Sequence, residues 1–277
     1  MAASRDAAGG PSPGAAQPES ADATQALGRL LADATRTGTP LAAPALAESG
    51  LVPASREAAM AAQAACVALL GKPVAGWKVA IGPGGIPLAA PMLELHDAQA
   101  AAPVGCRVPA LKAIEVEFAF RLRADLPARV GAPYGRDEVL GCVAAIHLGI
   151  ELISFRLQEE AKVDLPLFLA DRLGNGGYVL GPQVDRSTLE TAIGRRASQD
   201  LRVLVDGETR YSAKPSHPND DPLAPLVAYA NAQNDALGGL RAGQIITTGS
   251  LCGVIAAAPP CRLQIDWLHA LTITMMR

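Results

Sequence analysis

Two segments near the start of the chain have the apolar spacing of helices. Residues 21–37 predict one helix, because their apolar positions recur every three or four residues. Those positions are Ala26, Leu27, Leu30, Leu31 and Ala34. Residues 55–70 predict a second helix, with Ser55 as its N-cap and Gly71 directly after its last turn. We expect both helices to form an N-terminal helical subdomain over residues 21–72.

From residue 76 onward, short β-type segments alternate with Gly and Pro turns. The predicted strands are 76–81, 114–123, 143–153, 178–181, 201–206, 244–248, 263–265 and 271–275, and the predicted helices are 137–141 and 222–237. Many short strands with few helices favour an α+β fold with a mixed β-roll or sandwich core, and argue against a doubly wound parallel sheet. We expect residues 73–277 to form this catalytic β-roll domain.

Acidic and apolar residues alternate along residues 114–123. Successive side chains of a strand point to opposite faces, so the apolar even-numbered positions from Ile114 to Phe120 form a core face. Glu115 and Glu117 share the other face, roughly 7 Å apart along the strand. Such carboxylates repel each other unless water surrounds them or a cation lies between them. The pattern alone fits an edge strand facing water as well as a metal site.

A third acid in an apolar segment favours the metal site. Within residues 143–153, Glu151 and His147 fall on the face opposite the apolar positions, and an unpaired buried carboxylate there would be costly. Glu115, Glu117 and Glu151 would together offer an oxygen-only site for a hard cation, Mg²⁺ or Mn²⁺. For His147 we expect a hydrogen-bonded structural role.

Two other segments have features of substrate binding. Lys78 lies in a small apolar strand before a glycine-rich loop, where it either faces a site or extends along the surface into water. Residues 243–250 predict a buried strand that runs into a Gly-Ser turn, whose free N–H groups and hydroxyls can bind a carboxylate. An ordinary strand end fits the second segment equally well.

Composition and charge narrow the classes of partner. The chain has 277 residues and a formal net charge of −3 without any basic run, so neither nucleic acid nor a membrane is an expected partner. No uncharged apolar run reaches the roughly 18 residues of a membrane span. Residues 1–20 are rich in Ala, Gly, Pro and Ser, which predicts a disordered leader and no signal peptide. Five widely spaced cysteines indicate free thiols and a cytoplasmic protein.

Four motifs in this order resemble the fumarylacetoacetate hydrolase superfamily. They are Gly-Trp-Lys-Val (76–79), Ile-Glu-Val-Glu-Phe-Ala-Phe (114–120), Ile-Glu-Leu-Ile (150–153) and Gly-Gln-Ile-Ile-Thr-Thr-Gly-Ser (243–250). The branch that they resemble is that of the 2-keto-4-pentenoate hydratases and 4-oxalocrotonate decarboxylases. The resemblance implies the β-roll of the family's C-terminal domain, a homo-oligomer, and Mg²⁺ or Mn²⁺ as cofactor.

The resemblance also implies roles for individual residues. Glu115, Glu117 and Glu151 match the metal ligands of the family, and Lys78 and Glu117 are the expected catalytic residues. The expected substrate-binding residues are Lys78, Arg156, Thr248 and Ser250. The implied mechanism is metal-assisted proton transfer on a small 2-hydroxydienoic or 2-oxo acid, with Lys78 as the base if burial lowers its pKa.

The implied reaction is that of a hydratase. Water would add to a 2-hydroxy-2,4-dienoate or its 2-oxo-4-enoate tautomer to give a 4-hydroxy-2-oxo acid, as in the meta-cleavage catabolism of aromatic compounds. A decarboxylase of the 4-oxalocrotonate type and an acylpyruvate C–C hydrolase are alternatives with the same metal site. Ser154, Phe155 and Gln244 depart from the family pattern, which leaves a non-catalytic partner subunit as a further alternative.

Overall fold

The chain begins, in the described part, with three helices. The computed structural model describes residues 21–99, 104–108, 110–192 and 197–276, so the expected leader at residues 1–20 lies outside the described residues. The helices are α1 (Ala21–Thr37), α2 (Ala43–Glu48) and α3 (Arg56–Leu70). The predicted caps of α3 are confirmed, because the Ser55 hydroxyl accepts a hydrogen bond from an amide of the first turn and Gly71 adopts a left-handed φ of 65°.

The main sheet is curved and mixed, and it has eight strands among the described residues. Its order is β2-β1-β10-β5-β6-β7-β3, and β11 pairs with β5. The strands are β1 (Gly76–Ile81), β2 (Pro87–Met92), β3 (Leu95–Asp97), β5 (Ala113–Leu122), β6 (Val143–Ile153), β7 (Asn175–Val184), β10 (Ile245–Ser250) and β11 (Ile255–Ala256). Most neighbours are antiparallel, but β1 pairs with β10 and β3 pairs with β7 in parallel.

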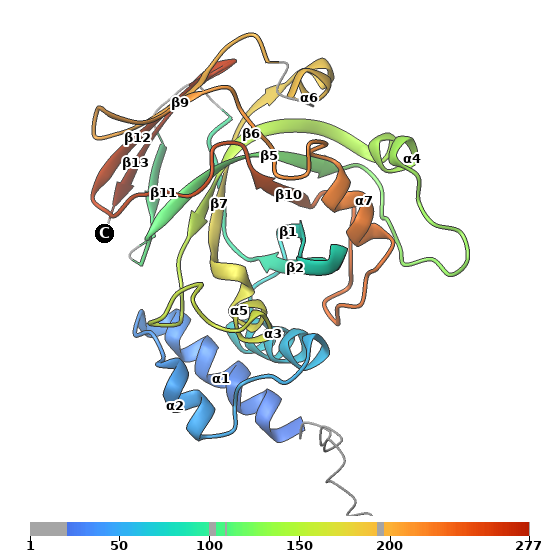
Figure 1. Ribbon diagram of the computed structural model, residues 1–277, viewed down its shortest axis with the longest axis vertical. Coiled ribbons are helices and arrows are strands. Elements are labelled where there is room, and N and C mark those ends of the chain that lie inside the picture. Colours follow the sequence, from blue (N-terminus) through green and yellow to red (C-terminus); the bar gives the residue numbers. More distant parts are fainter. Residues whose placement is uncertain (1–20, 100–103, 109, 193–196, 277) are drawn as a thin grey trace, which may run out of the picture.

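A second sheet packs against the first (Figure 1). Among the described residues it has five strands, in the order β4-β13-β12-β8-β9. They are β4 (Val104–Arg107), β8 (Leu201–Val205), β9 (Glu208–Ala213), β12 (Cys261–Trp267) and β13 (His269–Met276). The apolar face of β5 lies in the core between the sheets, where the ring of Phe118 meets that of Trp267 with centroids 5.8 Å apart. The predicted α+β fold with a mixed β-roll core is confirmed.

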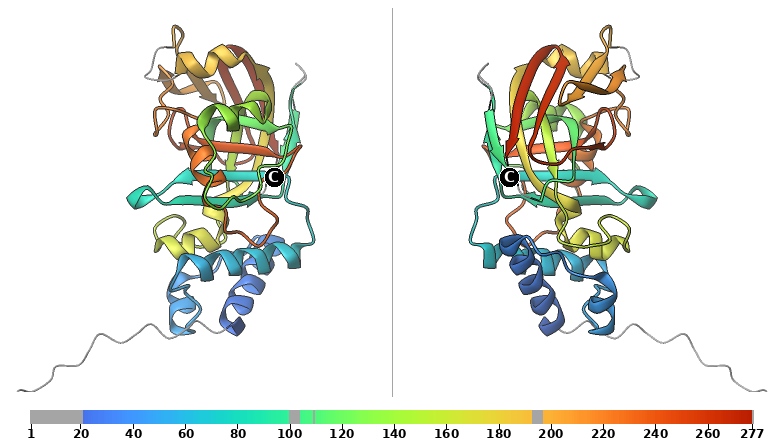
Figure 2. Two further views of the ribbon diagram at one scale, coloured as in Figure 1. Left: turned by 90° about the vertical axis from the view of Figure 1, so that its right-hand side faces the viewer. Right: turned by 90° about the vertical axis from the view of Figure 1, so that its left-hand side faces the viewer.

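The three N-terminal helices lie together at one end of the molecule, below the sheets (Figures 1 and 2). They share an apolar cluster with β2 and with the short helix α5 (Leu165–Ala170), which includes Leu31, Leu88 and Leu169. The helical segment therefore packs directly onto the β-core, while the proposed domain boundary at residue 72 stays a prediction. In the described part of the chain, no helix has the length and apolar character that crossing a membrane requires.

The remaining helices are short, and one of them corrects the sequence pattern. They are α4 (Arg136–Gly141), α6 (Arg186–Ala192) and α7 (Ala224–Ala230), together with the 3₁₀ turns η1 (Pro83–Gly85) and η2 (Arg172–Gly174). The helix predicted over residues 222–237 ends at Ala230. Beyond it, side chains bind the backbone of a loop: Asn231 exchanges hydrogen bonds with the main chain of Tyr134, and Asp235 accepts them from two loop amides. Such local bonds compete with helix continuation.

Candidate metal centre

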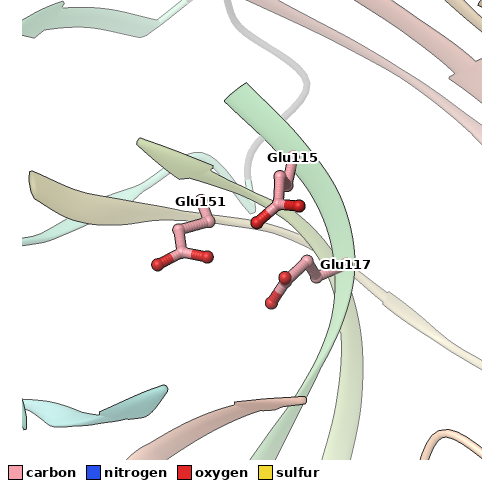
Figure 3. A group of neighbouring side chains, drawn as sticks. All are labelled: Glu115, Glu117 and Glu151. Atoms are coloured by element: carbon pink, nitrogen blue, oxygen red, sulfur yellow. The ribbon is translucent and has the colours of Figure 1, made fainter. Parts of the chain in front are cut away.

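Strand pairing brings the three predicted metal ligands together. In the antiparallel register of β5 and β6, Glu115 lies opposite Glu151 and Glu117 lies opposite Gly149. Their side chains project from the same face of the sheet toward one another (Figure 3). Glycine is needed at position 149, because a Cβ there would lie 2.6 Å from the hydroxyl of Tyr178 on β7. The missing side chain thus leaves room for an aromatic ring beneath the carboxylates.

The carboxylates are close enough to share one ion. One oxygen from each of Glu115, Glu117 and Glu151 lies within 4.8 Å of the others. Glu117 and Glu151 are fully buried, and neither oxygen of Glu117 has a hydrogen-bond partner in good geometry among the described residues. An unpartnered buried carboxylate is strongly unfavourable, and a bound divalent cation removes that cost. The donor set, three carboxylates and no sulfur or nitrogen, suits a hard cation.

Burial also changes the proton affinity of these acids. It raises the pKa of Glu115 to about 7, with a further contribution from Glu151, while Lys78 opposes the rise. The pKa of Glu117 is raised well above its ordinary value, first by burial and then by the charges of Glu151 and Glu115. Without a cation, the cluster therefore holds protons near neutral pH, and a cation must displace them in order to bind.

Lys78 on β1 completes the cluster. Its Nζ lies 2.8 Å from Oε2 of Glu151 and 3.7 Å from Oε2 of Glu115, so Lys78 faces the site and does not extend into water. Burial lowers the pKa of Lys78, but the charges of Glu151 and Glu115 outweigh burial and raise it overall. This shift applies to the cluster without a cation, and the expected role of Lys78 as a base stays a prediction. In this arrangement Lys78 is a cation and a hydrogen-bond donor.

Residues of β7 support the cluster from behind, and sequence reasoning missed them. The Asn175 amide donates a hydrogen bond of 2.8 Å to Oε1 of Glu151, and the Tyr178 hydroxyl donates one of 3.2 Å to the main-chain oxygen of Glu117. Asn175 and Tyr178 lie in or beside a glycine-rich segment that gave no chemical signal in the sequence. Such outer contacts orient the ligands of a metal site.

The structure places Arg156 behind the cluster. Its guanidinium is buried, forms an ion pair with Asp171 and donates a hydrogen bond of 2.8 Å to the main-chain oxygen of Asn175. Arg156 therefore supports the residue that holds Glu151, and its predicted contact with substrate stays a prediction. His147 has the expected structural hydrogen bond, between Nδ1 and the main-chain oxygen of Gly181 at 3.0 Å.

One side of the cluster opens into a cavity of about 440 Å³. Its lining residues are Lys78, Val79, Ala80, Glu115, Glu117, Ser216, Pro218, Gly249, Ser250 and Gly253. The Ser250 hydroxyl lies at this cavity and donates to the main-chain oxygen of Gly253 at 2.9 Å. The Thr248 hydroxyl is buried and has no hydrogen-bond partner. The Gly-Ser turn predicted to bind substrate therefore borders the acidic cluster.

A buried histidine holds the loop that covers this cavity. His217 Nδ1 accepts a hydrogen bond from the Asn219 amide, so Nε2 carries the proton and donates to the main-chain oxygen of Thr248 at 3.1 Å. The bond ties the loop bearing Ser216 and Pro218 to the end of β10. Sequence reasoning did not identify His217, because the loop lies about thirty residues away from β10 along the chain.

Comparison with known proteins assigns the chain to a family. The family described as fumarylacetoacetate (FAA) hydrolase C-terminal matches residues 86–268, which is more than half of the chain. This protein therefore belongs to the fumarylacetoacetate hydrolase family, and the family resemblance inferred from the sequence motifs is confirmed. A comparison with curated proteins gave no match.

Solved structures with the same fold include 4-oxalocrotonate decarboxylase from Pseudomonas putida G7. Its complex with magnesium and adipate has a TM-score of 0.73 at 14% identity, and the match covers 94% of this chain and 100% of that chain. The complex with calcium and acetate has a TM-score of 0.71 at 15% identity, with the same coverage. The likeness extends over the N-terminal helices as well as the β-roll, and at these identities it shows the fold.

Proposed function

We propose that this protein is a divalent-metal-dependent lyase, a hydratase that adds water to a 2-hydroxy-2,4-dienoate or its 2-oxo-4-enoate tautomer. The product would be a 4-hydroxy-2-oxo acid. The observation that carries the proposal is the convergence of Glu115, Glu117 and Glu151 beside Lys78. Lys78, Glu115 and Glu117 also line one cavity. The family assignment supports an enzyme of this general chemistry.

The residues present fit Mg²⁺ or Mn²⁺. Glu115, Glu117 and Glu151 would hold the ion, and the orphaned oxygens of Glu117 are the clearest sign that a positive partner belongs there. When bound, such an ion supplies Lewis-acid stabilisation of negative charge on the oxygen atoms of the substrate. Asn175 would keep the Glu151 carboxylate in position through its amide.

The charge of the cavity favours a monocarboxylic substrate. Among the described residues that line it, Lys78 is the only cation, and it already pairs with Glu151. Val79, Ala80 and Pro218 offer an uncharged wall for the far end of the substrate. A second carboxylate at that end would find no cationic partner among these described lining residues. This observation favours a dienoate with a short uncharged tail, which is the type of substrate that the proposed hydratase would use.

The chain's own groups would handle protons and orientation. The Lys78 amine would orient the substrate or the attacking water through hydrogen bonds from its position beside Glu151. Glu117 is the proposed base, although a carboxylate that holds the ion is a weak one. Ser250 would contact the substrate carboxylate by redirecting its hydroxyl from Gly253. Arg156 and Thr248 remain proposed binding residues.

A decarboxylase is the second candidate function. It is favoured by the similarity to 4-oxalocrotonate decarboxylase, which was captured with the dicarboxylate adipate and covers nearly the whole chain. An acylpyruvate hydrolase and a non-catalytic partner subunit are further proposals; the second rests on the departures at Ser154, Phe155 and Gln244. From the family resemblance we also propose a cytoplasmic homo-oligomer.

Product analysis of the purified full chain tests these proposals. The protein is stripped of metal, reloaded with Mg²⁺ or Mn²⁺, and given 2-hydroxypenta-2,4-dienoate, 4-oxalocrotonate or an acylpyruvate in parallel. Metal-dependent formation of a 4-hydroxy-2-oxo acid supports the hydratase. Release of CO₂ identifies a decarboxylase, two carbon fragments identify a hydrolase, and no turnover despite bound metal identifies a partner subunit. Glu151→Gln should abolish turnover, whereas Glu208→Gln on the exposed strand β9 serves as the matched control.

A further inference from the structure

A second cavity, of about 370 Å³, lies where the end of α1 and the start of β3 meet the segments that follow β6 and α5. It belongs to the junction between the N-terminal helices and the sheets, which Figure 1 shows below the strands. Among the described lining residues, the charged ones are mostly cationic: Arg36, Lys72, Arg107, Arg156 and Arg172, against Glu94 as the acid. The cavity is thus opposite in charge to the acidic metal centre.

The partners of these cations differ. Arg36 pairs with Asp33, and Lys72 pairs with Glu94, so both are neutralised at the exposed rim. Arg172 is different: it is only 5% exposed, and the one hydrogen bond that its side chain makes with the described residues is to the thiol of Cys66, at 3.5 Å. A guanidinium has five N–H donors. The buried Arg172 therefore has far more donor capacity than the protein satisfies.

The two carboxylates beside this cavity in the described part of the chain, Asp171 and Glu94, already have other cationic partners. Asp171 accepts hydrogen bonds from both the main chain and the side chain of Arg156, and it acts on Arg172 only through its charge. Burial also raises the pKa of the Cys66 thiol, which keeps that partner uncharged. Burial and the charge of Arg156 lower the pKa of Arg172 to about 10, and Arg172 is still a cation at neutral pH.

The open donors of Arg172 face the cavity. Each nitrogen atom of the Arg172 side chain either has a protein acceptor or is accessible to solvent. Because Arg172 lines the cavity, the accessible nitrogen atoms open onto it. The backbone of this segment is in the left-handed region, which residues other than glycine rarely adopt, with φ of 52° at Arg172 and 51° at Leu173. Ser154 lines the same cavity, and its hydroxyl has no hydrogen-bond partner among the described residues.

We propose that this cavity is a binding site for a small anion, a carboxylate or a phosphate, held by the Arg172 guanidinium and the Ser154 hydroxyl. Guanidinium groups bind both anions through paired hydrogen bonds, and a buried cation gains most from such a partner. The volume is in the range of small-molecule sites. The site is separate from the metal centre, but Asn175 borders it and holds Glu151, so an occupant would contact a residue that supports the metal ligands.

Substitution of Ser154 gives the sharpest test. Ser154→Asp would place a negative charge in the cavity beside Arg172, and Ser154→Asn has the same size without the charge. Inorganic phosphate and acetate are each titrated calorimetrically into the full chain with saturating Mg²⁺ and again after Mg²⁺ removal, with chloride as the ionic-strength control. We expect saturable binding of at least one anion that persists without Mg²⁺, and the tighter of the two identifies the class of ligand.

The variants assign the binding to this cavity. Ser154→Asp should weaken it by about tenfold or more, Ser154→Asn by about threefold or less, and Arg172→Gln by about tenfold or more. Because Arg172→Gln removes a buried side chain, the fold of this variant is checked by circular dichroism. If Arg172→Gln does not fold, the comparison of Ser154→Asp with Ser154→Asn decides. Crystals soaked with selenate, a scatterer of phosphate-like shape, should show the anion at Arg172. Binding that disappears with Mg²⁺, equal affinities for the two Ser154 variants, or no saturable binding of either anion would overturn the proposal.

Discussion

Replacing Glu117 by Gln tests whether the acidic cluster is built for a cation. Without metal, both oxygens of Glu117 are buried and lack hydrogen-bond partners, and its ligand atom lies within 4.8 Å of those of Glu115 and Glu151. At that separation and an effective dielectric constant of about 20, each pair of like charges repels by about 3.5 kcal/mol. Lys78 offsets part of this repulsion, and without metal the folded protein relieves the rest by protonating a carboxyl group.

The free energy of protonating Glu117 is an upper limit to the loss of stability that its buried carboxyl group causes. The ordinary pKa of Glu117 is 4.5, so holding a proton at pH 7 costs about 3 kcal/mol relative to the unfolded chain. Glu117→Gln has nearly the same shape and no charge, and it should therefore stabilise the metal-free protein by about 2–3 kcal/mol at pH 7. A carboxyl group whose folded pKa is raised destabilises the fold only above its unfolded pKa. The gain should therefore disappear as the pH falls to 4.5.

Urea unfolding between pH 4.5 and pH 7.5 measures this difference, first without metal and then with saturating Mg²⁺. With Mg²⁺ the sign should reverse, because the parent gains stability from metal binding and the variant loses a ligand. Glu208→Gln, at an exposed ion pair with Arg210, is the control and should change stability by less than about 0.5 kcal/mol in either condition. The reasoning fails if metal-free Glu117→Gln is less stable than the parent at pH 7, or if its gain does not depend on pH.

Three further predictions concern residues around the cluster. Lys78→Met should reduce kcat/KM by about a hundredfold or more while calorimetry still detects metal binding, and Lys78→Arg should restore part of the activity; full activity of Lys78→Met would contradict the assigned role. Asn175→Ala leaves Oε1 of Glu151 without its donor, so metal affinity should fall by about tenfold, and an unchanged affinity would show that the hydrogen bond is dispensable. Gly149→Ala forces a Cβ to within 2.6 Å of the Tyr178 hydroxyl and should lower the free energy of unfolding by about 1–3 kcal/mol or more; an unaffected urea midpoint would refute the packing argument.

The local structure of individual helices and strands could be predicted from the sequence. The caps of α3, the apolar face of β5 and the shared face of Glu115 and Glu117 follow from spacing alone, because they depend on residues within one helix turn or one strand. The helix predicted over residues 222–237 was too long for a related reason. The side chains of Asn231 and Asp235 form hydrogen bonds with the backbone of other segments or of the loop, and the apolar pattern does not predict those bonds.

The tertiary structure decided which of these residues meet. The register of β5 against β6 places Glu151 opposite Glu115, and the parallel pairing of β1 with β10 brings Lys78 to the same cluster. Those pairings are set by packing between segments far apart in the chain. The spacing of residues within one segment therefore does not predict them. The same holds for the ion pair of Arg156 with Asp171, which its sequence motif did not indicate. The sequence thus determined the kinds of side chain on each face, and long-range packing determined which charges they would meet.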